Sequence, residues 1–114
     1  MLGFSTVKVS GSSMSPTFMA GDWLLVKSIG SNSHPIKINR VCLINDPERP
    51  GVKLLKRVKD VEVNQVAGDK FEHKYWLEGD HLASTDSRKW GWLEEREIIS
   101  RVIFRYRKGK LINE

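Results

Sequence analysis

The spacing of chain breakers constrains the fold more than any other feature of this sequence. Short runs rich in Val, Ile, Leu and aromatic residues alternate with clusters of Gly, Pro, Asn and Asp, and helical periodicity is scarce. The breaker clusters lie at 19–22, 30–35, 45–51 and 68–69. The runs between them are predicted strands, at 4–9, 23–27, 41–44, 52–63, 74–78 and 98–106. Such a series of short strands indicates a mainly β protein.

The pattern within the strands predicts their arrangement. Apolar and polar side chains alternate at 61–63 and in part of 99–105, as is typical of strands with one face in water. No β-α-β rhythm is present, and one turn at 93–96 is the only helix we expect. We therefore predict a coiled antiparallel β-sheet with a barrel-like form. A single domain over 1–114 is expected, because half of 114 residues would be too small to bury an adequate core.

The charge of the chain does not by itself identify a partner. Lys and Arg number 19 against 14 Asp and Glu, which leaves a formal net charge of +5. The basic residues are scattered except in the last strand and the tail, where they are Arg101, Arg105, Arg107, Lys108 and Lys110. No Cys/His metal pattern and no recognition helix accompany them. We expect neither a nucleic-acid partner nor a metal site.

Cys42 is the only cysteine, so an intrachain disulfide is excluded. It lies within an apolar run, and we predict a small buried side chain. The histidines that would have to activate it, His34, His73 and His81, lie in polar or loop-like segments. A catalytic cysteine is therefore not expected.

The sequence has no segment that predicts insertion into a membrane. No run approaches the roughly 18 apolar residues that a membrane helix needs. The first residues also lack the basic and long apolar regions of a secretory signal. We expect no integral membrane segment and a cytoplasmic location.

Residues 10–18 form the first segment that suggests chemistry. Small residues just before Ser13 allow a sharp turn with exposed backbone N–H groups, a geometry that suits an oxyanion hole. Pro16 restricts the chain just after the turn. An ordinary Ser/Gly-rich loop would have the same composition, and five serines lie between Ser5 and Ser15. A second group is needed to select the nucleophile.

Lys56 is a candidate for that group. A lysine amine can serve as a base for serine once burial lowers its pKa toward the working pH. In a strand, Lys56 shares a face with Leu54 and Val58, whereas Leu55 and Arg57 point the other way. The alternative is a lysine that extends from a strand edge into water.

A polar segment at 79–91 has a glycine at each end. Asp86 and Arg88 within it are close enough to form a local ion pair. A surface pair of this kind contributes only about 0–1 kcal/mol, but it can hold a loop in one shape. The alternative is a solvated turn.

Together the three segments resemble the signal peptidase I family of serine–lysine proteases. The family's nucleophile box corresponds to Ser13-Met14-Ser15-Pro16-Thr17 followed by Gly21-Asp22, its lysine box to Lys56-Arg57-Val58, and its third box to Gly79-Asp80 and 84–91. All three occur in the family's order. The resemblance implies the family's β catalytic core and a serine endopeptidase that needs no metal or cofactor.

The resemblance also implies a role for each matched residue. Ser13 corresponds to the nucleophile, Lys56 to the general base, and Ser84 to the hydroxyl that orients the lysine amine. Asp86 and Arg88 correspond to the ion pair that braces the loop. The Ser13 N–H corresponds to one oxyanion donor.

The sequence departs from the family at three positions near these boxes. Gly11 stands where some members have a serine as second oxyanion donor, so that another N–H or the hydroxyl of Ser10 or Ser12 would have to serve. His81 replaces the usual Asn, and Asn39-Arg40 replaces a Gly-Asp pair.

The resemblance is greatest to a soluble subgroup, the maturation proteases of nickel-type superoxide dismutase. Chain length, the 83–88 form of the third box and the loop at 46–50 carry this likeness. It implies removal of an N-terminal extension from a precursor protein. Signal-peptidase-like processing of exported preproteins and a catalytically silent β module that binds a peptide remain alternatives.

We expect the substrate strand to pair with a sheet edge beside Ser13 and to place small side chains in shallow apolar pockets. Met14, Phe18 and Trp23 are candidates for the walls of those pockets and, equally, for the core.

Overall fold

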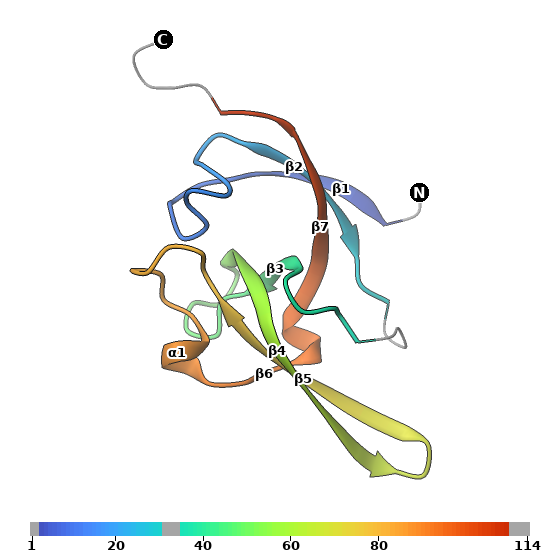
Figure 1. Ribbon diagram of the computed structural model, residues 1–114. Helices are drawn as coiled ribbons and strands as arrows, with labels where there is room; N and C mark the ends of the chain where they lie inside the picture. The colour runs from blue at the N-terminus through green and yellow to red at the C-terminus, as the bar shows by residue number, and fades with distance from the viewer. Residues whose placement is uncertain (1–2, 31–34, 110–114) are drawn as a thin grey trace.

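A computed structural model of the protein describes residues 3–30 and 35–109. Within these residues the chain forms one seven-stranded sheet with very little helix (Figure 1). The elements in chain order are β1 (Phe4–Lys8), β2 (Trp23–Ser28), β3 (Val41–Asn45), β4 (Lys53–Ala67), β5 (Lys70–Glu78), α1 (Ser87–Trp90), β6 (Leu93–Glu94), the 3-10 turn η1 (Glu95–Glu97) and β7 (Ile98–Arg107). The predicted mainly β architecture is confirmed.

Each predicted strand is present, and the differences lie at the ends. β4 and β5 continue beyond the predicted limits to meet at the Gly68-Asp69 turn, where Gly68 has a φ of +52°. The helical turn expected at 93–96 is instead the short strand β6 followed by η1. The sequence pattern also missed α1, because a single turn capped by the Asp86 side chain has too few residues to show periodicity.

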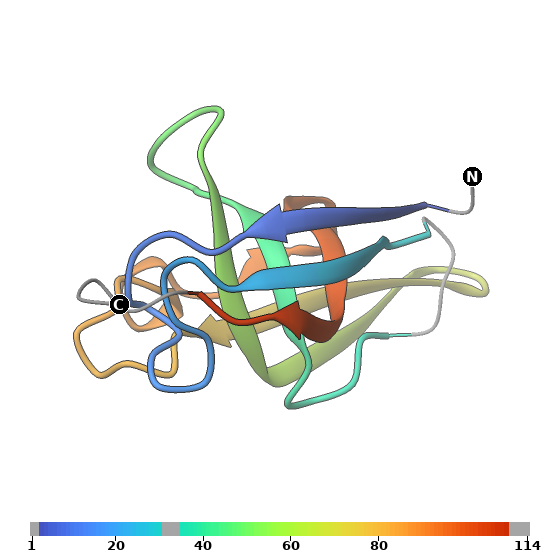
Figure 2. The same ribbon diagram turned by 90° about the horizontal axis from the view of Figure 1, so that it is seen from above.

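The strands are ordered β1-β2-β7-β3-β4-β5-β6, and all neighbouring pairs are antiparallel. In Figure 2, β1, β2 and β7 run side by side, and β4 crosses them steeply. The sheet is therefore strongly coiled, as expected from accumulated strand twist and from register shifts such as those between β2 and β7. Coiling brings the loop after β1 toward the start of β4.

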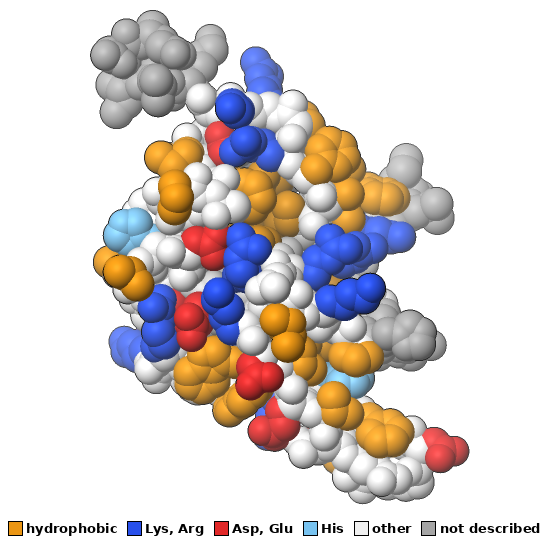
Figure 3. Space-filling model, viewed as in Figure 1, with side chains coloured by type: hydrophobic (Ala, Val, Ile, Leu, Met, Phe, Trp, Pro, Cys, Tyr) orange, Lys and Arg blue, Asp and Glu red, His pale blue; other side chains and the backbone are white. Residues whose placement is uncertain are grey.

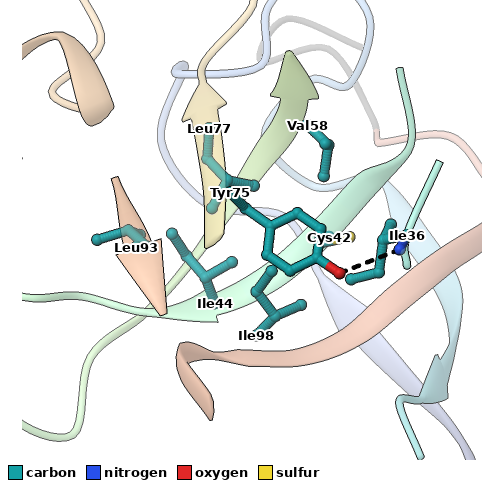
Figure 4. Close-up of a cluster of buried hydrophobic side chains, with 8 residues drawn as sticks. All are labelled: Ile36, Cys42, Ile44, Val58, Tyr75, Leu77, Leu93 and Ile98. Atoms are coloured by element: carbon teal, nitrogen blue, oxygen red, sulfur yellow. Dashed lines mark hydrogen bonds between the residues drawn. The ribbon is translucent and has the colours of Figure 1, made fainter. Parts of the chain in front are cut away.

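Two groups of buried side chains form the core. The first comprises Ile36, Cys42, Ile44, Val58, Tyr75, Leu77, Leu93 and Ile98, with the Ile36 N–H donating to the Tyr75 hydroxyl at 3.1 Å (Figure 4). The second comprises Val9, Met14, Leu24, Val26, Val41, Leu55 and Val102. Val58 of β4 belongs to the first group and Leu55 to the second, in line with the predicted alternation.

The far part of the β4–β5 hairpin projects from the rest of the molecule (Figure 1). Val63, Val66 and Phe71 on it are each about half exposed. The body of the sheet and the loops at its other end therefore contain the buried core and the candidate site.

Candidate active site

Ser13 lies in the loop between β1 and β2, whose base is closed by backbone hydrogen bonds. The Val9 N–H donates to the Asp22 carbonyl and the Gly21 N–H to the Val9 carbonyl, both at 2.8 Å. Met14, only 2% exposed, anchors the loop in the second core group. The Ser13 N–H has no acceptor among the residues that the structure describes, so this donor remains available.

Asp22, which directly precedes β2, anchors the end of this loop. Its buried carboxylate accepts from the N–H groups of Met19 at 2.9 Å and Gly109 at 2.6 Å and from the Arg105 guanidinium at 3.2 Å. Burial alone would raise the pKa of Asp22, but these hydrogen bonds lower it overall. The carboxylate therefore connects the loop to the residues at and after the end of β7, a structural role that the Gly-Asp motif did not predict.

Lys56 lies in β4, opposite Cys42 of β3, and is 2% exposed. Burial lowers the pKa of its amine. The negative charges of Asp86 and Asp46 act to raise that pKa, and the positive charge of Arg88 acts to lower it. Over the described part of the chain, no hydrogen-bond acceptor and no ion-pair partner lies against the amine. The net effect of this environment is a pKa for Lys56 below that of an exposed lysine.

The 79–91 segment packs directly against the Ser13 loop. The His81 N–H donates to the Ser13 carbonyl at 2.9 Å. A Cβ atom added at Gly79 would lie 2.6 Å from the Ser13 carbonyl oxygen and closer still to the Ser84 hydroxyl. Only glycine permits this approach of the two segments.

Ser84, Asp86 and Arg88 form one hydrogen-bonded cluster. The Ser84 hydroxyl donates to Asp86 at 2.5 Å and accepts from the Gly79 N–H at 3.2 Å. Arg88 binds the Asp86 carboxylate through Nε at 2.9 Å and Nη2 at 2.6 Å. Burial opposes ionisation of Asp86, which is 1% exposed, but these donors hold its pKa well below the usual range. Asp86 is therefore a fixed negative charge beside the site.

Asp80 connects all three segments. Its carboxylate accepts from Arg57 Nε at 2.8 Å, from Arg57 Nη2 at 2.7 Å and from the Thr17 hydroxyl at 2.5 Å. Arg57 follows Lys56 directly in β4, and Thr17 lies in the Ser13 loop. The paired charge lowers the pKa of Asp80 and raises that of Arg57. Each of the three residues belongs to a sequence motif, but the motifs did not indicate that they contact one another.

A cavity of about 680 Å³ brings the candidate residues together. Its lining includes Gly11, Ser12, Ser13, Met14, Lys56 and Ser84. Asp46, Glu48 and Arg49 also line it, from the loop between β3 and β4. The Glu48 carboxylate accepts from the Trp90 indole at 2.9 Å, which joins that loop to α1. The sequence indicated a loop at 45–51 but not that its charged side chains line the same cavity as Ser13.

Phe18 and Trp23 are not among the residues that line the cavity. Phe18 packs against the second core group. Trp23 lies in β2, with the Lys8 amine 6.0 Å from its ring centre. Of the three candidate substrate contacts, only Met14 is at the cavity.

Cys42 is free and fully buried between β4 and β7, and burial raises its thiol pKa to about 12.

Across residues 3–30 and 35–109, no group of three or more His, Cys, Asp and Glu side chains is placed to hold a metal ion. In the same residues, no helix has the length and apolar character needed to cross a membrane.

Comparison with known proteins adds evidence on ancestry. Residues 1–67, more than half of the chain, match the sequence profile of the family described as signal peptidase, peptidase S26. The chain belongs to the signal peptidase S26 family. The seven-stranded antiparallel sheet is consistent with the catalytic core of that family. The matched residues include both Ser13 and Lys56.

One curated relative of this peptidase S26 member is the mitochondrial inner membrane protease subunit 1 of Xenopus tropicalis. The two are 32% identical over 108 residues, which covers 84% of this chain. The chain spans 65% of the length of that relative.

Proposed function

We propose that this protein is a serine endopeptidase in which Ser13 is the nucleophile and neutral Lys56 is the general base. The proposal rests on the position of one buried lysine. Ser13 lines the same cavity as a lysine that is 2% exposed and has a lowered pKa. A protonated lysine without a paired carboxylate would be costly in such a place.

The chemistry is acyl transfer. Lys56 accepts the Ser13 proton while the Ser13 oxygen bonds to the scissile carbonyl carbon. The protonated amine then passes this proton to the leaving nitrogen, which breaks the peptide bond and leaves an ester at Ser13. Water activated by the same amine hydrolyses the ester and regenerates both groups.

Ser84 would orient the amine of Lys56. The Ser84 hydroxyl donates to Asp86 at 2.5 Å and accepts one hydrogen bond from the Gly79 N–H, so its oxygen, which lines the cavity, can accept one more. An N–H of Lys56 directed to this oxygen would leave the nitrogen lone pair for Ser13. The Asp86–Arg88 pair would brace Ser84 in this role.

The oxyanion would be held by the N–H of Ser13, which has no acceptor in the described residues. Gly11 has a φ of +76° and open space where a side chain would be, so it supplies a turn without a second side-chain donor. Ser12, exposed at the cavity, would complete the hole.

For the substrate we propose the precursor of a nickel-type superoxide dismutase, cleaved to release an N-terminal extension. Support comes from the form of the third box and from the 46–50 loop, which lines the cavity through Asp46, Glu48 and Arg49. Processing of exported preproteins is the second candidate, and the family description, signal peptidase, favours it.

The dyad is tested with Ser13→Ala and Lys56→Met. Methionine has about the length of lysine without its charge and therefore suits a buried site. Each variant should keep the fold by circular dichroism and reduce precursor cleavage by at least about 1000-fold. Lys59→Met, at an exposed position of the same strand, is the matched control and should cleave normally. Undiminished cleavage by either folded dyad variant would overturn the assignment.

The substrate is tested by supplying the wild-type protein with either type of precursor and sequencing the new N-termini. Cleavage of the nickel superoxide dismutase precursor at the start of the mature protein supports the first candidate. Cleavage of exported preproteins alone would replace it with the second. Binding of a peptide without cleavage, unaffected by Ser13→Ala, would identify a silent module.

A further inference from the structure

A second cavity lies at the other end of the sheet from Ser13. Its volume is about 430 Å³, and it is lined by residues from the end of β2, the approach to β3 and the start of β7. β3 runs from this cavity to Asp46, a distance of about 20 Å at ~3.3 Å per residue. The cavity is therefore separate from the candidate active site.

Positive side chains dominate this cavity. Lys27, Lys37, Arg40 and Arg101 line it, and none of the other described lining residues is acidic. None of these four cations makes an ion pair within residues 3–30 and 35–109, whereas Arg49, Arg57, Arg88 and Arg105 each bind a carboxylate. The Lys27 amine also lies 5.3 Å from the centre of the Phe4 ring, whereas no ring contact is recorded for the other three cations in the described residues.

The arrangement of the cations also favours an anionic ligand. Arg40 immediately precedes β3, and Arg101 pairs in register with Cys42 of β3. The two side chains line the same cavity, and the positive charge of each lowers the pKa of the Cys42 thiol. In Figure 3, Lys and Arg side chains gather toward the right of the view with no acidic side chain among them. Like charges that line one cavity repel each other, and an anion bound between them would relieve that repulsion.

The remaining lining residues indicate the kind of anion. Ile29, Pro35 and Ile36 supply apolar surface, and the described residues that line the cavity include no Phe, Tyr or Trp. Nucleic-acid bases would lack a stacking platform here. A carboxylate-bearing peptide, by contrast, can use both the guanidinium groups and the apolar surface.

We propose that this cavity, which we call the basic pocket (Lys27, Lys37, Arg40, Arg101 and the apolar residues between them), binds an acidic peptide segment of a partner protein. The site does not depend on the Ser13–Lys56 chemistry. A variant can therefore lose peptide binding at the basic pocket without losing proteolysis at Ser13, and the reverse also holds.

The test uses the Ser13→Ala protein, so that no probe is cut, and a fluorescein-labelled peptide of eight glutamates in a polarisation assay at low salt. Arg40→Ala is the main variant, because its side chain is exposed. Loss of one charge-assisted contact should weaken binding about tenfold. Lys37→Ala should weaken it in the same direction. Arg107→Ala, an exposed arginine of β7 outside the pocket, is the matched control and should bind within twofold.

A glutamine peptide, a single-stranded oligonucleotide and inorganic phosphate complete the assay. The proposal requires the glutamate peptide to bind more tightly than all three and to be displaced by added salt. Equal binding by Arg40→Ala and Arg107→Ala would overturn it. Tighter binding of the oligonucleotide would assign the pocket to nucleic acid instead, and phosphate binding without peptide preference would reduce it to a simple anion site.

Discussion

The protonation state of Lys56 is determined by a small set of neighbours. Burial of the side chain is the largest influence on its pKa and lowers it, while Asp86 and Asp46 oppose this change through their charges. Asp86 is already neutralised in part by Arg88 at 2.6 Å. Asp46 is paired with Arg49 at 2.7 Å and lines the cavity. The Asp46 carboxylate can therefore be changed without touching the Ser84 cluster.

Asp46→Asn should shift the pH dependence of cleavage to lower pH. Loss of the negative charge removes one influence that raises the pKa of Lys56, so the amine becomes neutral at a lower pH. Since cleavage requires the neutral amine, kcat/KM should reach half of its maximum at a lower pH than in the wild-type protein. The measurement is a full pH profile of kcat/KM.

Asp60→Asn, in β4 but without influence on Lys56, is the control and should leave the midpoint unchanged. A midpoint that rises in Asp46→Asn, or one that equals the control, would contradict the electrostatic account of this lysine.

At the scale of elements, the candidate site consists of three segments joined by side chains. The Ser13 loop, β4 and the 79–91 segment meet at Asp80, which binds Thr17 and Arg57. The His81 N–H adds a backbone bond to the Ser13 loop. Removal of the Asp80 carboxylate would leave the Arg57 guanidinium, 21% exposed, without this partner. The contacts that position the loop would then weaken while the sheet remained.

Asp80→Ala should lower the free energy of unfolding by about 1–3 kcal/mol, the cost of leaving polar groups unpaired. It should also reduce kcat by more than it changes KM, because the Ser13 loop loses its fixed position. Urea denaturation and steady-state kinetics measure the two effects. Asp69→Ala, at the exposed hairpin turn, should change stability by less than about 0.5 kcal/mol. Similar effects of the two substitutions would contradict the role of Asp80.

At the scale of the whole molecule, three carboxylates, two buried and one partly buried, hold the site end of the sheet together. Asp22, Asp80 and Asp86 each bind donors from segments distant in the sequence or from a charged neighbour, and each has a lowered pKa. A carboxyl group with a lower pKa in the folded state binds fewer protons there than in the unfolded chain. Folding stability therefore rises with pH across the interval between the two pKa values.

We predict that the free energy of unfolding falls as the pH drops below about 4, the ordinary range of these carboxyl groups. Urea denaturation at pH 6 and pH 3 measures the loss. Asp86→Asn should be less stable at pH 6 and lose less on acidification, because one contributing carboxylate is gone. An acid loss of the same size in Asp86→Asn as in the wild type would show that Asp86 does not contribute.

Several features of this protein followed from the sequence alone. Short β-type runs between breakers predicted strands near their observed positions, because strand formation and turn formation depend largely on local residue types. The alternation around Lys56 predicted that Leu54 and Leu55 face opposite sides, since the period of a strand is two residues. The ordered boxes predicted the family, which the match over 1–67 confirms.

Other features were decided only by the tertiary structure. Three of them depend on how the sheet coils. Coiling brings Thr17, Arg57 and Asp80 into contact and leaves Phe18 and Trp23 away from the cavity. It also gathers four cations in one pocket, namely Lys27, Lys37, Arg40 and Arg101. Coiling results from twist and register shifts summed over many strands, and it joins residues far apart in the chain. The residues of a single segment do not determine which distant segment it will contact.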